Sequence, residues 1–194
     1  TLAAMTGVEG TLSTPLAREE LQAIDGIVML AAGTSHYAAM VARYWIESLA
    51  RVPVSCEIAS EYRYRKPVTG AFSCAVAISQ SGESLDTLMA MRHAGEAGLR
   101  TIGLVNVPGS TIAREAELVM PTRAGPEIGV ASTKAFTAQL TALISFAVAL
   151  AEAKGQISVE RRDEIHAAIQ GLPSMVGRTL GQCDDIRPVA HSLS

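Results

Sequence analysis

The chain has 194 residues, of which 48% are hydrophobic and only 4% aromatic, and it carries a formal net charge of −3. This length is enough to bury a core without disulfides or a structural metal, and the weak negative charge provides no long-range attraction for nucleic acid. A mean hydropathy of +0.25 with so few aromatic residues predicts a core built mainly from Ala, Val, Ile and Leu.

Short apolar runs alternate with helical patterns along most of the chain. Five of these runs predict buried strands, at residues 27–31, 53–58, 74–78, 101–105 and 118–120. Helical spacing predicts intervening helices at 34–51, 82–98 and 111–115, with a short helix or turn at 60–64. This alternation predicts an α/β fold, a three-layer sandwich in which helices flank both faces of a five-stranded parallel sheet.

Helical patterns also extend the chain on both sides of this core. Residues 131–153 form an Ala-rich pattern that is apolar nearly all round, which predicts a helix buried on most sides. Two more helices are expected at 159–172 and 175–194, separated by Pro173. We therefore expect a single domain over 1–194, with a core at about 27–150 and helical extensions at 1–25 and 156–194. Because the chain starts without Met and ends inside a helical pattern, we expect it to be part of a longer protein.

Membrane, metal and redox chemistry have little support in the sequence. The longest apolar stretch, 140–150, is too short for a membrane span, and no secretory signal pattern opens the chain, so a cytoplasmic protein is expected. Cys56, Cys74 and Cys183 lack metal or redox spacing, and the four histidines form no ligand pair. Neither a metal nor an organic cofactor is implied.

A polar loop at residues 79–84 (SQSGES) joins an apolar strand to a helix. The first turn of a helix offers unpaired N–H groups and a partial positive charge, both of which favour a phosphate. Ser79, Gln80, Ser81 and Ser84 add neutral donors, and Gly82 lets the backbone approach a ligand. A serine-rich helix cap is the simpler interpretation, but one serine would satisfy it. Four such side chains in six residues favour anion binding.

Two further polar segments are expected at the same edge of the sheet, where ligands of parallel sheets bind. In the first, residues 33–36, Thr34 or Ser35 either caps its helix or contacts a ligand. The second, 127–134, ends in Lys134, for which local backbone bonding or pairing with Glu127 is a better interpretation than catalysis. Dinucleotide, P-loop and hydrolase-elbow motifs are absent.

Six motifs in unbroken order resemble one family. They are GTS at 33–35, RYWIESL at 43–49, EIASEYRYR at 57–65, SQSGESLDT at 79–87, NVPGS at 106–110 and EIGVASTKAFT at 127–137. Together they are similar to the isomerase domain of the glucosamine-6-phosphate synthases (glutamine–fructose-6-phosphate aminotransferases, isomerizing), within the broader sugar isomerase (SIS) fold, which is Rossmann-like or flavodoxin-like. The resemblance covers residues 27–150 and corresponds to the first of two SIS halves.

The resemblance implies a binding role for eight residues. Ser79, Gln80, Ser81 and Ser84 would hold the phosphate of fructose 6-phosphate or glucosamine 6-phosphate, with Ser35 nearby. Thr34 would line the sugar, and the Val130 carbonyl and Ser132 would contact its hydroxyls. His36 stands at a variable position and is not expected to act in ring opening.

The family's catalytic groups lie in the second half, the C-terminal tail and a neighbouring subunit, so no catalytic residue is assigned in this chain. The chain alone is expected to bind sugar phosphate without catalysis. Implied partners are the second SIS half, a glutaminase domain and a second copy of the chain in a homodimer. Two alternatives remain open: a deaminating aminosugar-phosphate isomerase of SIS type, and a non-enzymatic SIS regulator that senses sugar phosphate.

Overall fold

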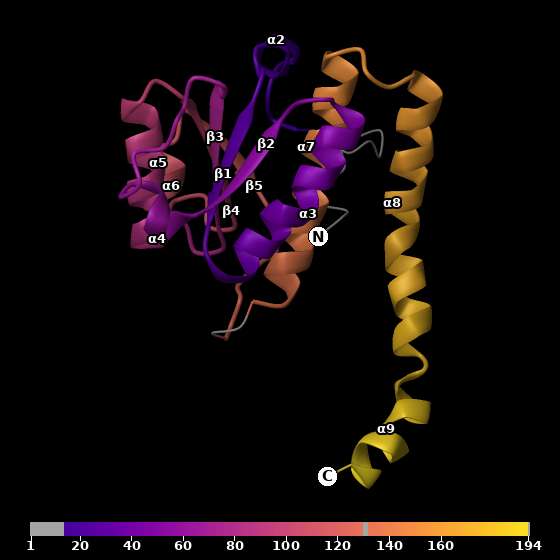
Figure 1. Ribbon diagram of the computed structural model, residues 1–194. Coiled ribbons are helices and arrows are strands. Elements are labelled where there is room, and N and C mark those ends of the chain that lie inside the picture. The colour runs from indigo at the N-terminus through magenta and orange to yellow at the C-terminus, as the bar shows by residue number, and fades with distance from the viewer. Residues whose placement is uncertain (1–13, 130–131, 194) are drawn as a thin grey trace. The chain divides into compact units, whose positions relative to one another are not determined.

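Five parallel strands form the centre of the chain in a computed structural model, which describes residues 14–129 and 132–193 (Figure 1). The strands are β1 (Ile27–Ala31), β2 (Val54–Ile58), β3 (Cys74–Ser79), β4 (Arg100–Val105) and β5 (Leu118–Pro121). Their order across the sheet is β2-β1-β3-β4-β5, and every neighbouring pair is parallel. The predicted five-stranded parallel sheet is confirmed.

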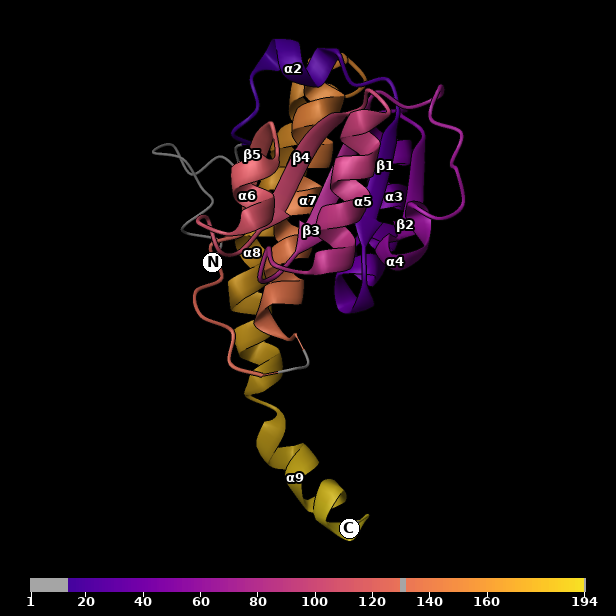
Figure 2. The same cartoon turned by 90° about the vertical axis from the view of Figure 1, so that its left-hand side faces the viewer.

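Helices cover both faces of this sheet (Figures 1 and 2). One face carries α3 (Gly33–Leu49) and α7 (Lys134–Ala153), and the other carries α4 (Ala59–Tyr62), α5 (Leu85–Glu96) and α6 (Thr111–Glu115). The alternation of side chains along β1 explains this arrangement, because Met29 and Ala31 belong to one core cluster and Leu30 to the other. The predicted three-layer α/β architecture is therefore confirmed.

The register of the two central strands positions the candidate site. Ala31 of β1 pairs with Ile78 of β3, so these strands end side by side. The chain leaves β1 toward β2 at one edge of the sheet, and it leaves β3 toward β4 in the direction of the other edge. An open sheet with this order forms a crevice at the carboxyl ends of the two strands.

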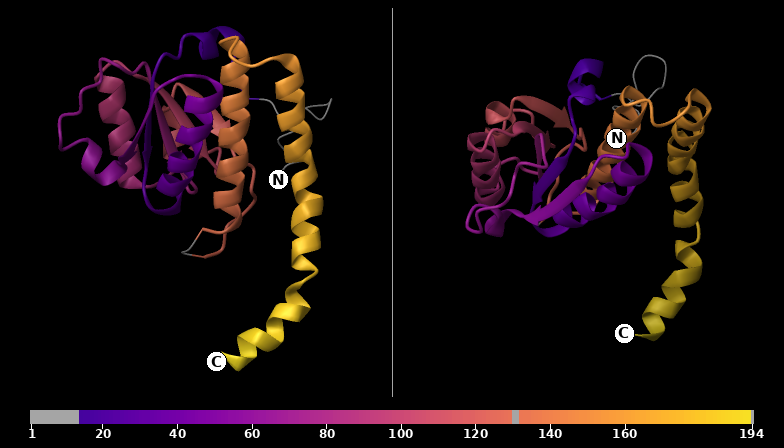
Figure 3. Two further views of the ribbon diagram at one scale, coloured as in Figure 1. Left: turned by 45° about the vertical axis from the view of Figure 1, so that its right-hand side comes forward. Right: turned by 45° about the horizontal axis from the view of Figure 1, so that its top comes forward.

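Helix α7 is the long apolar helix of the unit, and it lies beside α3 in both views of Figure 3. By length and composition it could cross a membrane, but 67% of its most apolar window is buried in the protein. At its far end, α2 (Arg18–Gln22) is attached to it, since the Gln22 amide donates to the Ala153 carbonyl and the Lys154 ammonium contacts Asp25 at 2.8 Å. Its apolar surface is that of a core helix.

Several helix starts differ from the predictions, among them those of the helices after β1 and β3. The helix predicted from residue 82 begins at Leu85, because Gly82 has a φ of +67° and the chain turns there before the helix can form. The helix predicted from residue 34 begins at Gly33, with Ala32 as its N-cap and no side-chain cap bond. Thr34 and Ser35 therefore do not cap this helix, and the Ser35 hydroxyl has another partner.

Residues from Val159 onward form a second compact unit, distinct from the unit that ends at Ser158. It consists of α8 (Val159–Leu180) and α9 (Cys183–Ser192). The predicted helix break at Pro173 is wrong, because α8 continues through this residue. A proline removes one backbone hydrogen bond but leaves helical dihedral angles accessible, and the chain instead breaks at the turn around Gly181. Of the helical extension predicted at 1–25, residues 1–13 lie outside the described residues.

Candidate functional site

Three polar segments gather at the carboxyl edge of the sheet, which lies at the lower side of Figure 1. Residues 79–84 begin with the last residue of β3, residues 33–36 follow β1, and residues 127–134 lead into α7. The first two segments leave neighbouring strands at paired positions, so they flank the crevice between β1 and β3. This is the place where the sequence predicts an anion site.

The hydroxyl oxygens of the loop at 79–84 each accept a hydrogen bond from within the protein. The Gly82 N–H donates to Ser79 Oγ at 3.0 Å, and the Glu83 N–H donates to Ser81 Oγ at 3.1 Å. The Thr87 hydroxyl is 3.1 Å from Ser84 Oγ. Because a serine has a single O–H donor, an oxygen that accepts internally leaves that donor for a ligand.

The start of α5 adds backbone donors beside these hydroxyls. Ser84 is its N-cap residue, and the helix has no side-chain cap bond. The first N–H groups of an uncapped helix have no partner within the helix, and the helix dipole gives them partial positive charge. Residues 79–87 thus offer hydroxyl and amide donors and include no lysine or arginine, a set that suits an anion such as a phosphate.

Ser35 approaches the crevice from the first turn of α3 and is tied to α7. Its side chain is buried, and the Gln139 Nε2 amide donates to its Oγ at 2.9 Å. Like the serines of the loop, Ser35 is thus left with a free O–H donor. Thr34, its neighbour, is exposed at the same helix start.

The segment at 106–112 supports the loop from the side of β4. The Asn106 N–H donates to the Gln80 carbonyl at 3.2 Å, and the Ile112 N–H donates to the Gly82 carbonyl at 3.0 Å. The Glu83 carboxylate accepts from the Thr111 N–H at 2.8 Å. Hydrogen bonding to the side chain and backbone of Thr111 lowers the pKa of Glu83, so this carboxylate is ionised and held at the start of α6.

The third segment is shaped by Glu127 and Asn106. Glu127 accepts from the Ala135 N–H at 2.8 Å and from the Thr133 hydroxyl at 3.2 Å, so it caps α7. Asn106 Oδ1 accepts from the Ala124 N–H at 2.7 Å and fixes the chain leaving β5. Ser132 Oγ is buried and lacks a hydrogen-bond partner within residues 14–129 and 132–193, which leaves it available to a ligand.

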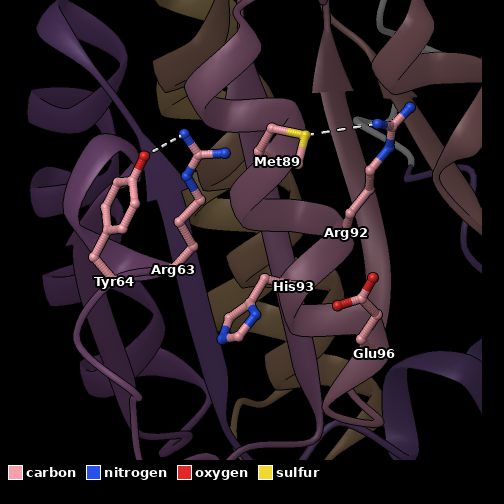
Figure 4. Close-up of a pocket in the computed structure, with 6 residues that line it drawn as sticks. All are labelled: Arg63, Tyr64, Met89, Arg92, His93 and Glu96. Atoms are coloured by element: carbon pink, nitrogen blue, oxygen red, sulfur yellow. Dashed lines mark hydrogen bonds between the residues drawn. The ribbon is translucent and has the colours of Figure 1, made fainter.

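A separate groove of about 460 Å³ lies on the α4–α5 side of the molecule (Figure 4). It is lined by Arg63, Tyr64, Met89, Arg92, His93 and Glu96. The two guanidinium groups have partners there, since Arg63 donates to the Tyr64 hydroxyl at 2.6 Å and Arg92 pairs with Glu115 at 2.6 Å. None of the predicted binding residues lines this groove.

The thiols of the first unit are poor nucleophiles. Burial raises the pKa of Cys74 to about 12 and that of Cys56 to about 11, so both stay protonated near neutral pH. All three cysteines are free. Over the described ranges, 14–129 and 132–193, no three His, Cys, Asp or Glu side chains gather in a metal-binding arrangement. The donors at the carboxyl edge are therefore the chemically distinctive groups of this unit.

Most of the predicted binding residues lie on the two connections that follow β1 and β3. Ser79, Gln80, Ser81 and Ser84 share one loop, with Thr34 and Ser35 on the neighbouring connection. Ser132 precedes α7, and Val130 lies outside the described residues. Sequence reasoning missed Gln139, whose signal is the one side-chain amide of a largely apolar helix, and it missed the supporting role of the Asn106 side chain.

Comparisons with known proteins show which family the chain resembles. Residues 20–149 match the SIS domain family. The glutamine–fructose-6-phosphate aminotransferase (isomerizing) of Zymomonas mobilis is 48% identical over 187 residues, which cover 96% of this chain and 31% of that protein. The enzyme of the same name from Bordetella parapertussis is 52% identical over 158 residues, covering 81% of this chain and 26% of that protein.

A solved structure extends the likeness to three dimensions. The C-terminal domain of glucosamine-fructose-6-phosphate aminotransferase from Francisella tularensis superimposes with a TM-score of 0.90 at 38% identity. The match covers 96% of this chain and 53% of that one. The chain thus spans less than a third of the curated relatives it matches and about half of the solved domain.

Proposed function

The chain belongs to the SIS domain family, and on this premise we propose that it binds the phosphate of a hexose 6-phosphate at the loop formed by residues 79–84. The observation that carries the proposal is the set of serine oxygens that accept internal hydrogen bonds and keep their O–H groups free. Ser79 and Ser81 accept from backbone N–H groups, which fixes the direction of these two bonds, and Ser35 accepts from the Gln139 amide. Such an array favours an acceptor-rich ligand, and a phosphate offers only acceptors when ionised.

The sugar extends from the phosphate toward α3 and α7 in this proposal. Ser79, Gln80, Ser81 and Ser84 hold the phosphate, with Ser35 beside them. Thr34 lines the sugar, and the Val130 carbonyl and Ser132 contact its hydroxyls. The buried, unpartnered oxygen of Ser132 supports this role, because a buried hydroxyl without a partner is costly unless a ligand satisfies it.

We further propose that the chain is the first SIS half of a glutamine–fructose-6-phosphate aminotransferase (isomerizing). The substrate class is then fructose 6-phosphate or glucosamine 6-phosphate, the compartment is the cytoplasm, and no cofactor takes part. Relatives that carry this name match 81% and 96% of the chain, which supports the assignment. The partners are a second SIS half and a glutaminase domain.

The half-site binds without catalysing isomerisation. Moving a proton between two sugar carbons requires a positioned base. The proposed binding side chains are hydroxyls and an amide, and the one carboxylate in the loop, Glu83, is committed to Thr111. Its lowered pKa makes it a weaker base still. Isomerisation by the purified chain would contradict this part of the proposal.

Self-association into a homodimer uses the outer face of α3 in this account. The apolar helix α7 is mostly buried within the chain, as its composition predicts, and leaves little apolar surface for a second copy. Helix α3 instead exposes Tyr37, Met40 and Tyr44 along one face. Light scattering at micromolar concentration tests the dimer, and a monomer counts against it.

Calorimetric titration of the chain with fructose 6-phosphate tests the binding proposal. Fructose serves as the control that lacks the phosphate, and inorganic phosphate serves as the control that lacks the sugar. We expect fructose 6-phosphate to bind most tightly and fructose to give no measurable heat. Equal affinity for fructose and fructose 6-phosphate would contradict a phosphate site.

A further inference from the structure

Gln139 is a buried amide of which only one end has a partner. Its side chain is 1% exposed, and Nε2 donates to Ser35 Oγ at 2.9 Å. Its Oε1 is also buried but has no hydrogen-bond partner among the described residues. The other buried polar side chains of α7 behave differently, because Thr141 and Ser145 bond to carbonyls of their own helix. Gln139 instead reaches across to α3.

The direction of this hydrogen bond decides what Ser35 can offer a ligand. A serine hydroxyl has one donor and two acceptor positions. When the amide N–H of Gln139 points to Oγ, the Ser35 O–H remains free to donate to an anion. If the amide were rotated by half a turn, Oε1 would take up that O–H, and Ser35 would offer only lone pairs, which suit a sugar hydroxyl.

Gln139 differs in this respect from the donors that orient the serines of the loop. Ser79 and Ser81 accept from the backbone N–H groups of Gly82 and Glu83, which have no acceptor end to exchange. The amide of Gln139 carries both a donor and an acceptor on one rotatable group. Ser84 pairs with the Thr87 hydroxyl, so among the serines that pair with a nitrogen donor, Ser35 is the one whose hydrogen-bond direction depends on a side chain.

We propose that Gln139 is a positioning residue that sets the Ser35 hydroxyl as a hydrogen-bond donor toward the phosphate. The inference rests on the proposed function and deepens it, since it identifies the group that selects an anion over a neutral hydroxyl at this position. Gln139 acts through Ser35 and itself touches no ligand. Its effect on binding should therefore require the Ser35 hydroxyl.

A double-mutant cycle measures that dependence with fructose 6-phosphate as the probe. Gln139→Met keeps the length of the side chain but removes the donor, and we expect it to weaken binding about 3- to 10-fold, the effect of one lost hydrogen bond. Gln139→Glu replaces the donor with an acceptor and adds charge, and we expect a larger loss. Gln22→Met is the matched control, because it removes a side-chain amide hydrogen bond to the Ala153 carbonyl at the far end of α7.

The cycle is completed in a Ser35→Ala background. There Gln139→Met should change the affinity by less than about twofold, because the hydroxyl through which it acts is gone. Equal losses in both backgrounds would show a general packing role and overturn the inference alone. Wild-type affinity in Gln139→Met would do the same.

Side-chain NMR provides a second measurement should Gln139→Met fail to fold. In the 15N-labelled chain, the Gln139 NH2 signals should shift when fructose 6-phosphate is added, and Ser35→Ala should abolish that shift. A shift that persists without the Ser35 hydroxyl would overturn the inference. Failure of the unaltered chain to bind fructose 6-phosphate would overturn the proposed function and this inference together.

Discussion

Gly82 packs directly against Ser110, so closely that a Cβ on Gly82 would overlap the Ser110 side chain. Gly82 also has a φ of +67°, a conformation that residues with a side chain rarely adopt. Ser110 begins the short helix α6 and is buried. The contact therefore joins the loop at 79–84 to the segment after β4 and fixes how the loop leaves the sheet.

Substituting Gly82 with Ala should destabilise the chain and distort the loop. The left-handed φ and the clash with Ser110 act together, and we expect a loss of about 2–4 kcal/mol in the free energy of unfolding, above the usual effect of strain alone. Urea denaturation measures the free energy of unfolding. Titration with fructose 6-phosphate measures the affinity, which reports whether the loop keeps its conformation. Binding should fall below detection.

Gly98→Ala is the matched control for this substitution. Gly98 has a φ of +87°, but a Cβ there would meet nothing within 4 Å. It should show the cost of strain without the clash, about 1–2 kcal/mol, and leave binding unchanged. Adding Ser110→Gly to Gly82→Ala should recover part of the stability. Equal effects of the two glycine substitutions would contradict the role of the Gly82–Ser110 contact.

Replacing Ser81 with Ala should weaken the binding of fructose 6-phosphate by about 1–3 kcal/mol, because the hydroxyl that would donate to the phosphate is removed. Titration calorimetry gives the change in Kd. Ser48→Ala is the control, since the Ser48 hydroxyl bonds to the Trp45 carbonyl at the other end of α3. An unchanged affinity for Ser81→Ala would reject the assigned role.

Glu83 should make the chain sensitive to acid. Hydrogen bonds from Thr111 lower its pKa from 4.5, so the carboxylate contributes stability that is complete above pH 4.5 and is lost as the pH falls through the folded value. Glu83→Gln should therefore be less stable than the wild type near pH 7, and the difference should shrink below pH 4.5. Urea denaturation at several pH values from 7 to 3 measures this difference in the free energy of unfolding.

The exposed Glu96 on α5 provides the comparison for this pH series. Glu96→Gln changes the same charge without removing a contact to α6. A difference between wild type and Glu83→Gln that stays constant from pH 7 to pH 3 would show that the ionised carboxylate is not what holds Thr111.

Thiol labelling should distinguish Cys183 from Cys74. Cys183 is exposed, whereas Cys74 is buried and its pKa is raised to about 12. Because the thiolate is the reactive form, iodoacetamide at pH 8 should modify Cys183 quickly and Cys74 only after unfolding. Peptide mapping by mass spectrometry identifies the modified residues. Rapid modification of Cys74 in the folded chain would contradict its burial at the start of β3.

The sheet could be predicted from the sequence because its strands are short apolar runs bounded by turn residues. The whole of β1 and of β3 is buried, so their composition carries the signal. Helix ends were harder to predict. The start of α5 depends on the packing of Gly82 against Ser110. Helix α8 continues through Pro173, although a proline in the sequence usually predicts a helix end.

The candidate site could be proposed from the sequence where its residues are adjacent in the chain. Ser79, Ser81 and Ser84 occur within six residues after an apolar strand, and local chemistry is enough to single them out. Gln139 and Ser35 are 104 residues apart, and their hydrogen bond exists only because α3 packs against α7. Periodicity places Gln139 on a buried face but does not indicate its partner.

A structure of the chain soaked with fructose 6-phosphate tests the central claim most directly. We expect the phosphate at the start of α5, within hydrogen-bond distance of the Ser79, Ser81 and Ser84 hydroxyls, with the sugar pointing toward Ser132. A phosphate bound elsewhere, for example in the groove beside Arg63 and His93, would contradict the account.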